Sequence, residues 1–169
     1  MAAACEVSEG EEVPPCFVCA KHRAQDEAQG GVLYQDDLVY AGHVHTMGHA
    51  AAYRGHLVAE PRRHVEGIGL LDDAEAARLG WLTNRLAALL RDELAADHVY
   101  SFVLGGAPVT AQTPAHLHVH VVPRFAGTPP EFAGPSLTRW PAAPRVDPVE
   151  MRALVAALRA RLEAGDPPA

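Results

Sequence analysis

The sequence predicts an α+β fold built around an antiparallel β-sheet. Short segments with strand-like composition occur in both halves of the chain, and one long leucine-rich helical pattern lies between them. Residues 116–122 alternate histidine with apolar side chains, which is the two-residue period of a β-strand. Strands and helices do not alternate regularly, as a parallel sheet would require. We therefore expect an antiparallel sheet with one long central helix and a C-terminal helix.

Composition and length indicate one soluble domain. The chain has 169 residues and a net charge of -7, which argues against a broad surface for the phosphate backbone of nucleic acids but not against binding a single nucleotide. The acidic residues 1–13 lack the pattern of a signal peptide, and no apolar run reaches the roughly 20 residues that cross a membrane. We expect a cytoplasmic protein with a flexible leader at residues 1–14 and no membrane or nucleic-acid partner.

Three short strands are expected in the first half of the chain, at residues 32–34, 38–40 and 55–60. A short helical piece precedes them, beginning near Cys16 and ending before two consecutive glycines. Pro61 stops the third strand, because proline lacks the N–H that a ladder uses. Residues 42–52 show no clear pattern.

The strongest helical pattern covers residues 74–96, where leucines recur every three or four positions. These leucines are Leu79, Leu82, Leu86, Leu89, Leu90 and Leu94. Asp72 offers an N-cap, and Glu75 places a negative charge in the first turn, where the helix dipole favours it. We expect this helix to cover one face of the sheet, with its leucines in the core.

The second half adds a strand at residues 98–104, a loop, and then the histidine strand. Residues 127–148 are rich in proline and are expected to be irregular. A last helix at residues 148–164 starts with a proline and stops before a glycine, the usual placement of these residues at helix ends. We expect residues 127–169 to pack on the same domain.

The stretch 116–124 holds three histidines at every second position, and Pro123 is expected to end its strand. The imidazoles should share one face, with Leu117, Val119 and Val121 on the other face in the core. Neighbouring histidines lie roughly 6.5–7 Å apart, close enough to share a metal, whereas the outer two lie roughly 13 Å apart. Imidazole can attack, exchange protons or bind a metal, so a divided role is expected. A simple exposed polar face has the same pattern.

Cys16 and Cys19 form a Cys-x-x-Cys pair whose spacing suits one tetrahedral zinc ion. A structural zinc has four ligands, and His64 and His116 are candidates for the other two. The pair could instead be a redox dithiol, or two buried thiols that behave as small apolar groups. A redox pair usually precedes a helix in a βαβ unit, which the pattern here does not show.

Together these residues resemble the histidine-triad (HIT) family of nucleotide hydrolases and transferases, in its zinc-containing Cys-x-x-Cys form. The family signature is His-φ-His-φ-His-φ-φ with φ apolar, and residues 116–122 match it at every position. Further segments that resemble the family are Gln112-Thr113, Pro123-Arg124 and residues 55–65, which a long helix follows. The likeness implies a HIT domain at residues 15–126.

The resemblance implies a five-stranded antiparallel sheet, a homodimer, and a reaction at the α-phosphate of a nucleotide phosphoanhydride or phosphoramidate. His118 would attack the phosphorus and form a covalent nucleotidyl-histidine, which divides one displacement into two. His120 would contact the phosphate and protonate the leaving group. Gln112 and Thr113 would bind the substrate, Thr113 through its hydroxyl.

The resemblance also implies a structural zinc ion. Its ligands would be Cys16, Cys19, His64 and His116. A fixed His116 would in turn orient His118, so the metal would not act as a Lewis acid.

The sequence differs from relatives at two places. Gly105 stands where they usually have Asn or Gln, and residues 42–45 lack the acidic residue that grips the ribose hydroxyls. His43, His45 and His49 either replace such contacts or belong to a solvated loop. The base and leaving group therefore stay open. A catalytically weak nucleotide-binding or regulatory protein on this scaffold is a second hypothesis, and a metalloenzyme with the three histidines as catalytic ligands is a third.

Overall fold

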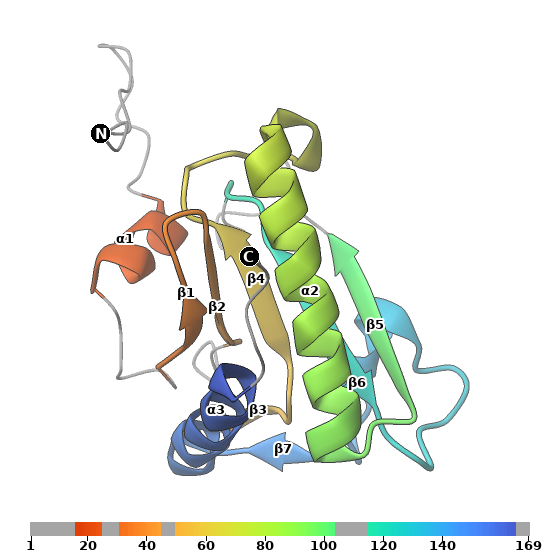
Figure 1. The fold of residues 1–169 in the computed structure, drawn as a ribbon. Coiled ribbons are helices and arrows are strands. Elements are labelled where there is room, and N and C mark those ends of the chain that lie inside the picture. The colour runs from red at the N-terminus through yellow and green to blue at the C-terminus, as the bar shows by residue number, and fades with distance from the viewer. Residues whose placement is uncertain (1–15, 25–30, 45–49, 104–114, 165–169) are drawn as a thin grey trace.

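The expected α+β arrangement is confirmed, with a five-stranded antiparallel sheet at its centre (Figure 1). The computed structural model describes residues 16–24, 31–44, 50–103 and 115–164. The strands, in sheet order, are β1 (Val32–Gln35), β2 (Val39–His43), β4 (Leu57–Pro61), β6 (Val119–Arg124) and β5 (His98–Val103). Each neighbouring pair is antiparallel. The four strands predicted before the histidine strand are all present, with ends shifted by a few residues.

Helix α2 (Asp73–Leu94) covers one face of the sheet, as predicted, and Figure 1 shows it lying along β4 and β6. The Asp72 side chain accepts from the Glu75 N–H, and the Glu75 side chain accepts from the Asp72 N–H. This capping box fixes where the helix begins. The predicted leucines are buried in one apolar core, except Leu94, which packs against it partly exposed.

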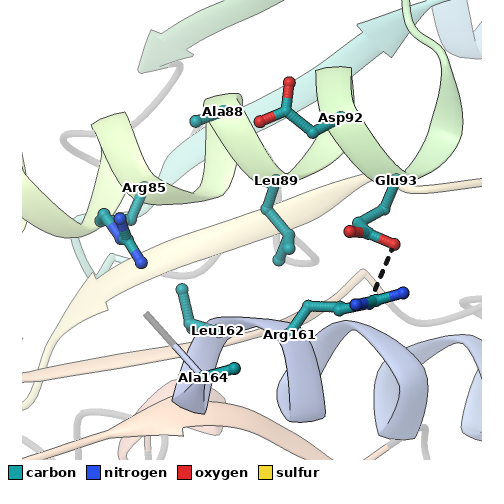
Figure 2. Close-up of a pocket in the computed structure, with 8 residues that line it drawn as sticks. All are labelled: Arg85, Ala88, Leu89, Asp92, Glu93, Arg161, Leu162 and Ala164. Atoms are coloured by element: carbon teal, nitrogen blue, oxygen red, sulfur yellow. Dashed lines mark ion pairs between the residues drawn. The ribbon is translucent and has the colours of Figure 1, made fainter. Parts of the chain in front are cut away.

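Helix α3 (Pro148–Glu163) packs against α2, β1 and β2. The side chain of Asp147, which the sequence analysis did not single out, caps its first turn. Arg161 Nε lies 3.3 Å from Glu93 Oε2 beside a shallow pocket between the two helices (Figure 2). The α3 side chains that enter the core shared with α2 are Met151, Val155, Leu158 and Leu162. The C-terminal helix is therefore part of the same core as the sheet.

The histidine strand starts later than the sequence predicts. The β4–β6 ladder ends at the pair of Ala59 and Val119, and β6 begins there. Residues 116–118 are held differently, since the His116 side chain donates to the Pro61 carbonyl across a distance of 2.8 Å. This side-chain bond, together with the hydrogen bond from the Leu117 N–H to the Val65 carbonyl, takes the place of the ladder beside the first two histidines.

The prediction that Pro123 ends the strand is wrong. Its neighbour in the sheet is Val99 of β5, whereas the ladder with β4 stops at the pair of Leu57 and Val121. Pro123 thus has a strand on one side only, a position that proline tolerates. The predicted core face of the stretch is confirmed, with Leu117, Val119 and Val121 buried in the main core.

Two segments without predicted structure contribute a second, two-stranded sheet. Its antiparallel strands are β3 (Ala52–Tyr53) and β7 (Arg145–Val146). Strands of two residues have no period to recognise, so residues 42–52 and 127–148 gave no signal. The 3-10 helix η3 (Gly134–Arg139) lies in the second segment and buries Leu137 against Val122 in a separate apolar cluster.

Two short elements complete the fold. The helical piece predicted after Cys16 is α1 (Phe17–Ala24), and a 3-10 helix, η2 (Ile68–Leu70), precedes α2. Within the described ranges, no helix combines the length and the apolar character that crossing a bilayer needs.

Candidate active site and metal centre

The reactive face of the sheet is the one opposite α2. In the register of the sheet, His120 sits between Val58 of β4 and Phe102 of β5. Its neighbours along β6 point into the core under α2, so its own side chain lies on the other face. Helix α1 packs on this face at Glu60, and η3 packs on it at Val122. The second and third triad histidines lie between these two covers.

His118 is held in one orientation by the backbone. Its Nδ1 lies 2.8 Å from the carbonyl oxygen of His116, and its side chain is largely buried. A carbonyl oxygen only accepts hydrogen bonds, so Nδ1 must carry a proton and donate it. In the neutral ring the lone pair is then on Nε2, the nitrogen directed away from this bond. The geometry therefore gives His118 the tautomer of an imidazole nucleophile.

His120 is paired with His56, to which the sequence pattern assigns no role. His56 Nε2 lies 2.9 Å from His120 Nδ1, so one nitrogen carries the proton and the other accepts it. The His120 ring also stacks on Phe102, with centroids 5.1 Å apart, and meets the His118 ring edge-on at 4.7 Å. Period-two counting back from Glu60 places His56 on the triad face, so a register argument could have found it.

Both members of this pair are held neutral. Burial and the neighbouring His118 ring lower the pKa of His120 to about 4, against the opposing charge of Glu60. Burial, followed by the His120 ring, brings the pKa of His56 well below its ordinary value. An anion bound beside these rings would favour their protonated forms. The pair can therefore gain a proton when a phosphate arrives.

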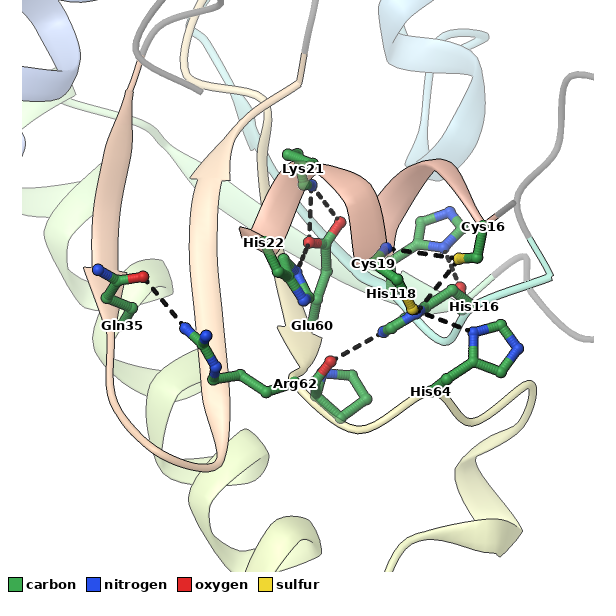
Figure 3. Close-up of polar contacts among 11 residues, drawn as sticks. Cys16, Cys19, Lys21, His22, Gln35, Glu60, Arg62, His64, His116 and His118 are labelled. Atoms are coloured by element: carbon green, nitrogen blue, oxygen red, sulfur yellow. Dashed lines mark hydrogen bonds and ion pairs between the residues drawn. The ribbon is translucent and has the colours of Figure 1, made fainter. Parts of the chain in front are cut away.

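Cys16, Cys19, His64 and His116 come together as one group of possible metal ligands, as Figure 3 shows. Their ligand atoms all lie within 4.8 Å of one another. Cys19 Sγ lies 3.4 Å from His64 Nδ1 and 3.5 Å from His116 Nδ1, and Cys16 Sγ lies 3.6 Å from the same His116 nitrogen. Sulfur and nitrogen ligands of a tetrahedral zinc ion are about 3.6 Å apart, given the usual bond lengths. The four residues can hold a metal of this kind.

The protonation of these groups also fits a metal. His116 Nε2 donates to the Pro61 carbonyl, so the lone pair of Nδ1 faces the thiols. Burial lowers the pKa of His116 to about 4, although its bond with Pro61 opposes the shift, so the ring is neutral as a ligand must be. The backbone N–H of Cys19 donates to Cys16 Sγ. A redox pair or two apolar thiols would not explain why the imidazoles of His64 and His116 lie beside the cysteines. His118 and His120 do not belong to this group of possible ligands.

A buried carboxylate lies next to this centre and was not foreseen. Lys21 Nζ is 2.7 Å from both oxygens of Glu60, and His22 Nε2 is 2.8 Å from Oε2 (Figure 3). Burial by itself raises the pKa of Glu60, but the hydrogen bond from His22 and the charge of Lys21 outweigh it and bring the pKa to about 2. The carboxylate is therefore ionised and fully paired.

Several predicted residues lie outside the described residues. These are Gln112 and Thr113, the departure at Gly105, and His45 and His49. His43 is described, and its placement in a solvated loop is wrong. It is 2% exposed, its Nδ1 donates to the Val44 carbonyl, and its Nε2 accepts from the Gly55 N–H. His43 fixes the entry to β4 and makes no described contact with the triad.

Comparison with known proteins identifies the family. The model of the HIT domain matches residues 25–127, which is more than half of the chain. A Zn-bound histidine triad family protein from Mycobacterium smegmatis has a similar structure, with 23% identity, a TM-score of 0.64, and coverage of 90% of this chain and 98% of that one.

Two further structures share the fold. A hypothetical histidine triad nucleotide-binding protein from Sulfolobus tokodaii is 20% identical, with a TM-score of 0.64 and coverage of 88% of this chain and 93% of that one. The diadenosine triphosphate hydrolase of Plasmodium falciparum, in complex with cyclomarin A, is 15% identical, with a TM-score of 0.58 and coverage of 82% and 79%. The chain belongs to the HIT family of nucleotide hydrolases and transferases.

Proposed function

We propose that this protein is a nucleotidyl hydrolase or transferase that acts at the α-phosphate of a dinucleoside polyphosphate or a nucleoside phosphoramidate. The observation that carries the proposal is the hydrogen bond from His118 Nδ1 to the His116 carbonyl, 2.8 Å long. In the neutral form of the ring, this bond leaves the Nε2 lone pair available, as nucleophilic catalysis requires. Membership of the HIT family supports the same reaction class.

The proposed reaction consists of two displacements. In the first, His118 Nε2 bonds to the α-phosphorus, the bond from that phosphorus to the leaving oxygen or nitrogen breaks, and His120 gives the leaving group a proton. In the second, water or another acceptor attacks the phosphorus, the phosphorus–nitrogen bond breaks, and the proton of the acceptor passes to His120. Hydrolysis then yields a nucleoside monophosphate and the leaving group.

His120 is the proposed general acid because its ring lies against that of the nucleophile. As an imidazolium, His120 would donate from Nδ1 to His56 Nε2 and carry its second proton on Nε2, from which that proton can reach a leaving group. The pKa of His120 is about 4 without substrate. A bound phosphate raises that pKa, so the acid forms when the substrate is present.

Gln112 and Thr113 are proposed as substrate contacts from the family pattern. They precede the triad by a few positions in the sequence. A hydroxyl and loop amides stabilise the negative charge that phosphoryl transfer places on the equatorial oxygens. Thr113→Val, which keeps the shape and removes the hydroxyl, should then reduce kcat more than it raises KM.

We propose zinc as the metal of the Cys16, Cys19, His64 and His116 group. Two thiolates and two imidazoles form a closed tetrahedral set, which is typical of structural zinc. Bound zinc would supply stability, while His116 keeps its carbonyl on His118. Elemental analysis of Cys16→Ser should show loss of zinc. The control is Cys5→Ser, because Cys5 does not belong to the Cys-x-x-Cys pair. If Cys16→Ser retained zinc, the metal would have to be bound by other residues.

We also propose a cytoplasmic homodimer. β5 is an edge strand that pairs only with β6 in the described part of the chain, so one row of its backbone groups can meet a second copy. Reduced thiols suit a cytoplasmic location. Light scattering across a concentration series should give twice the chain mass, and a monomer throughout would contradict the dimer.

The test of the function compares two histidine variants. His118→Ala should lose at least about a thousandfold in turnover of adenosine phosphoramidate or a dinucleoside polyphosphate, as removal of a nucleophile does elsewhere. His98→Ala removes an exposed histidine from the neighbouring strand and should leave turnover unchanged. Unchanged turnover in folded His118→Ala would refute the proposal. Nucleotide binding by calorimetry with no turnover of any substrate would favour the regulatory alternative.

A further inference from the structure

Three ionisable side chains are buried together where α1 meets β4. Lys21 is 7% exposed, His22 5% and Glu60 2%. Such residues are rarely buried unless they are paired, because an uncompensated charge in the interior is costly. The proposed reaction uses none of the three. Their burial therefore calls for a different role.

Both partners of Glu60 come from α1. This helix has eight residues, too few to be stable in isolation, so contacts with the rest of the fold must hold it. The thiol ligands at its start are one attachment, and the carboxylate bonded to Lys21 and His22 near its end is another (Figure 3). The helix is thus held at two ends, and only one attachment involves the metal.

His22 also contacts the first triad histidine. Its ring meets the His116 ring edge-on, with centroids 5.4 Å apart and an interplanar angle of 89°. Lys21 bonds the same carboxylate, but its other described contact is with the ring of Tyr40. The His22 ring also lies against Tyr40, with centroids 4.7 Å apart, so the two neighbours on α1 share Glu60 and Tyr40 and differ in whether they contact His116.

The end of β4 restrains His116 from two directions. The Pro61 carbonyl accepts from His116 Nε2, and the adjacent Glu60 holds the His22 ring against the His116 ring. Among the described residues, Nδ1 of His22 has no hydrogen-bond partner. The bond to Glu60 is therefore the hydrogen bond that fixes how the His22 ring lies.

We propose that His22, held by Glu60, is a positioning residue that keeps His116 in its site orientation independently of the metal, so that the His116 carbonyl stays aimed at His118. This rests on the proposed function only in taking His118 as the nucleophile. With a metal bound, the His116 ring is fixed through Nδ1 as well. Without one, the restraints from β4 and α1 act together with the hydrogen bond from the Leu117 N–H to the Val65 carbonyl, which holds the same peptide unit as the His116 carbonyl.

Two variants separate positioning from simple attachment of α1. His22→Phe and Lys21→Met each remove one hydrogen-bond donor to Glu60. Each replaces the polar side chain with an apolar one of similar size. Only His22→Phe frees a ring that lies against His116. If the cluster merely attaches α1, the two variants should behave alike.

The measurement uses the full chain without substrate. Two-bond proton–nitrogen spectra of the imidazoles, recorded after zinc removal, report which nitrogen of His118 carries the proton. We expect the Nδ1–H form in the wild type and in Lys21→Met, and a mixture of tautomers in His22→Phe that zinc restores to the Nδ1–H form. Zinc affinity should fall about tenfold in His22→Phe, as for loss of an outer-shell partner, and change less than about twofold in Lys21→Met.

Equal behaviour of the two variants, in tautomer and in zinc affinity, would overturn the proposal. If His22→Phe does not fold without zinc, the variant His22→Gln is used instead. Glutamine keeps a hydrogen-bond donor for Glu60 but has no ring to lie against His116. The same tautomer mixture is expected there, and a wild-type spectrum would overturn the proposal. A chain that shows the tautomer difference but turns over no nucleotide would refute the proposed function and leave this inference standing.

Discussion

The two faces of the central sheet are built on different principles. The face under α2 and α3 is apolar, and it is stabilised by removing leucine, valine and alanine side chains from water. The opposite face carries ionisable groups, each held by a directed hydrogen bond or a paired charge. Neighbouring residues of β6 serve both faces, with Val121 in the core and His120 beside His56. Stability and chemistry are thus separable within one strand.

The difference determines how each face should fail. Loss of apolar volume on the core face should destabilise the protein without changing the chemistry of the folded fraction. Loss of a partner on the polar face should leave a buried group unsatisfied and disturb the site as well. Variants of each face test this distinction.

The largest effect is expected from Glu60→Ala on the polar face. Removing the carboxylate leaves Lys21 and His22 buried without their partner, which costs about 3–5 kcal/mol of unfolding free energy. Chemical denaturation with zinc held constant measures the loss. Glu163→Ala, which removes an exposed carboxylate at the end of α3, is the control and should change stability by less than about 0.5 kcal/mol. A loss below about 1 kcal/mol for Glu60→Ala would contradict the paired-charge account.

On the core face, Leu86→Ala should lower the unfolding free energy by about 2–5 kcal/mol, because Leu86 is fully buried in the middle of α2. The kcat of the folded fraction should stay within about twofold of the wild type, since Leu86 lies in the apolar core under α2, on the face of the sheet opposite His120. Denaturation and steady-state kinetics on the same preparation check both parts. A fall in kcat larger than tenfold would show that the two faces are not independent.

Gly55→Ala should destabilise by about 1–3 kcal/mol. Gly55 has φ of +76°, and an added Cβ would lie 2.7 Å from Leu94 Cδ1 and 3.0 Å from Pro123 Cγ. Gly127→Ala is a matched control, because its φ is +82° but nothing lies within 4 Å of the added atom. The difference in unfolding free energy between the two variants measures the cost of the steric contacts of the added Cβ. If both variants lost the same stability, backbone strain from the positive φ would account for the whole effect.

The Glu60 carboxylate should also make the stability depend on acid pH. The pKa of Glu60 is lowered from 4.5 to about 2, so its stabilisation is complete above about pH 4.5 and is lost as the pH falls towards 2. The gap in stability between the wild type and Glu60→Gln should therefore narrow over this window. Denaturation at several pH values, with Glu163→Gln as the control, follows the gap. A gap that stays constant down to pH 2 would mean that the carboxylate does not titrate with folding.

The same contrast explains what the sequence could predict. Helix α2 was predictable because six leucines repeat with a helical period and Asp72 caps it. The metal group was predictable because Cys16, Cys19 and the two histidines belong to a family pattern. The Glu60 cluster was not, because neither Lys21 nor His22 has any sequence relation to a residue on β4. The paired strands β3 and β7 are too short to show a period, and their partnership depends on the tertiary fold.

The start of β6 shows the limit most clearly. Alternation of histidine and apolar residues predicts a strand from His116, and Leu117, Val119 and Val121 do enter the core, although His116 and His118 are buried as well. The ladder begins only at Val119, because the His116 side chain, and not a ladder bond, meets Pro61. Periodicity predicts which way side chains point, whereas backbone pairing depends on residues distant in sequence.

The most direct test of the central claim is mass spectrometry of the protein after incubation with adenosine phosphoramidate and rapid quenching. The account predicts one nucleotidyl group added to the peptide that contains His118, and no such adduct in His118→Ala. Turnover without any adduct, or an adduct on a different residue, would contradict the role assigned to the Nε2 of this histidine.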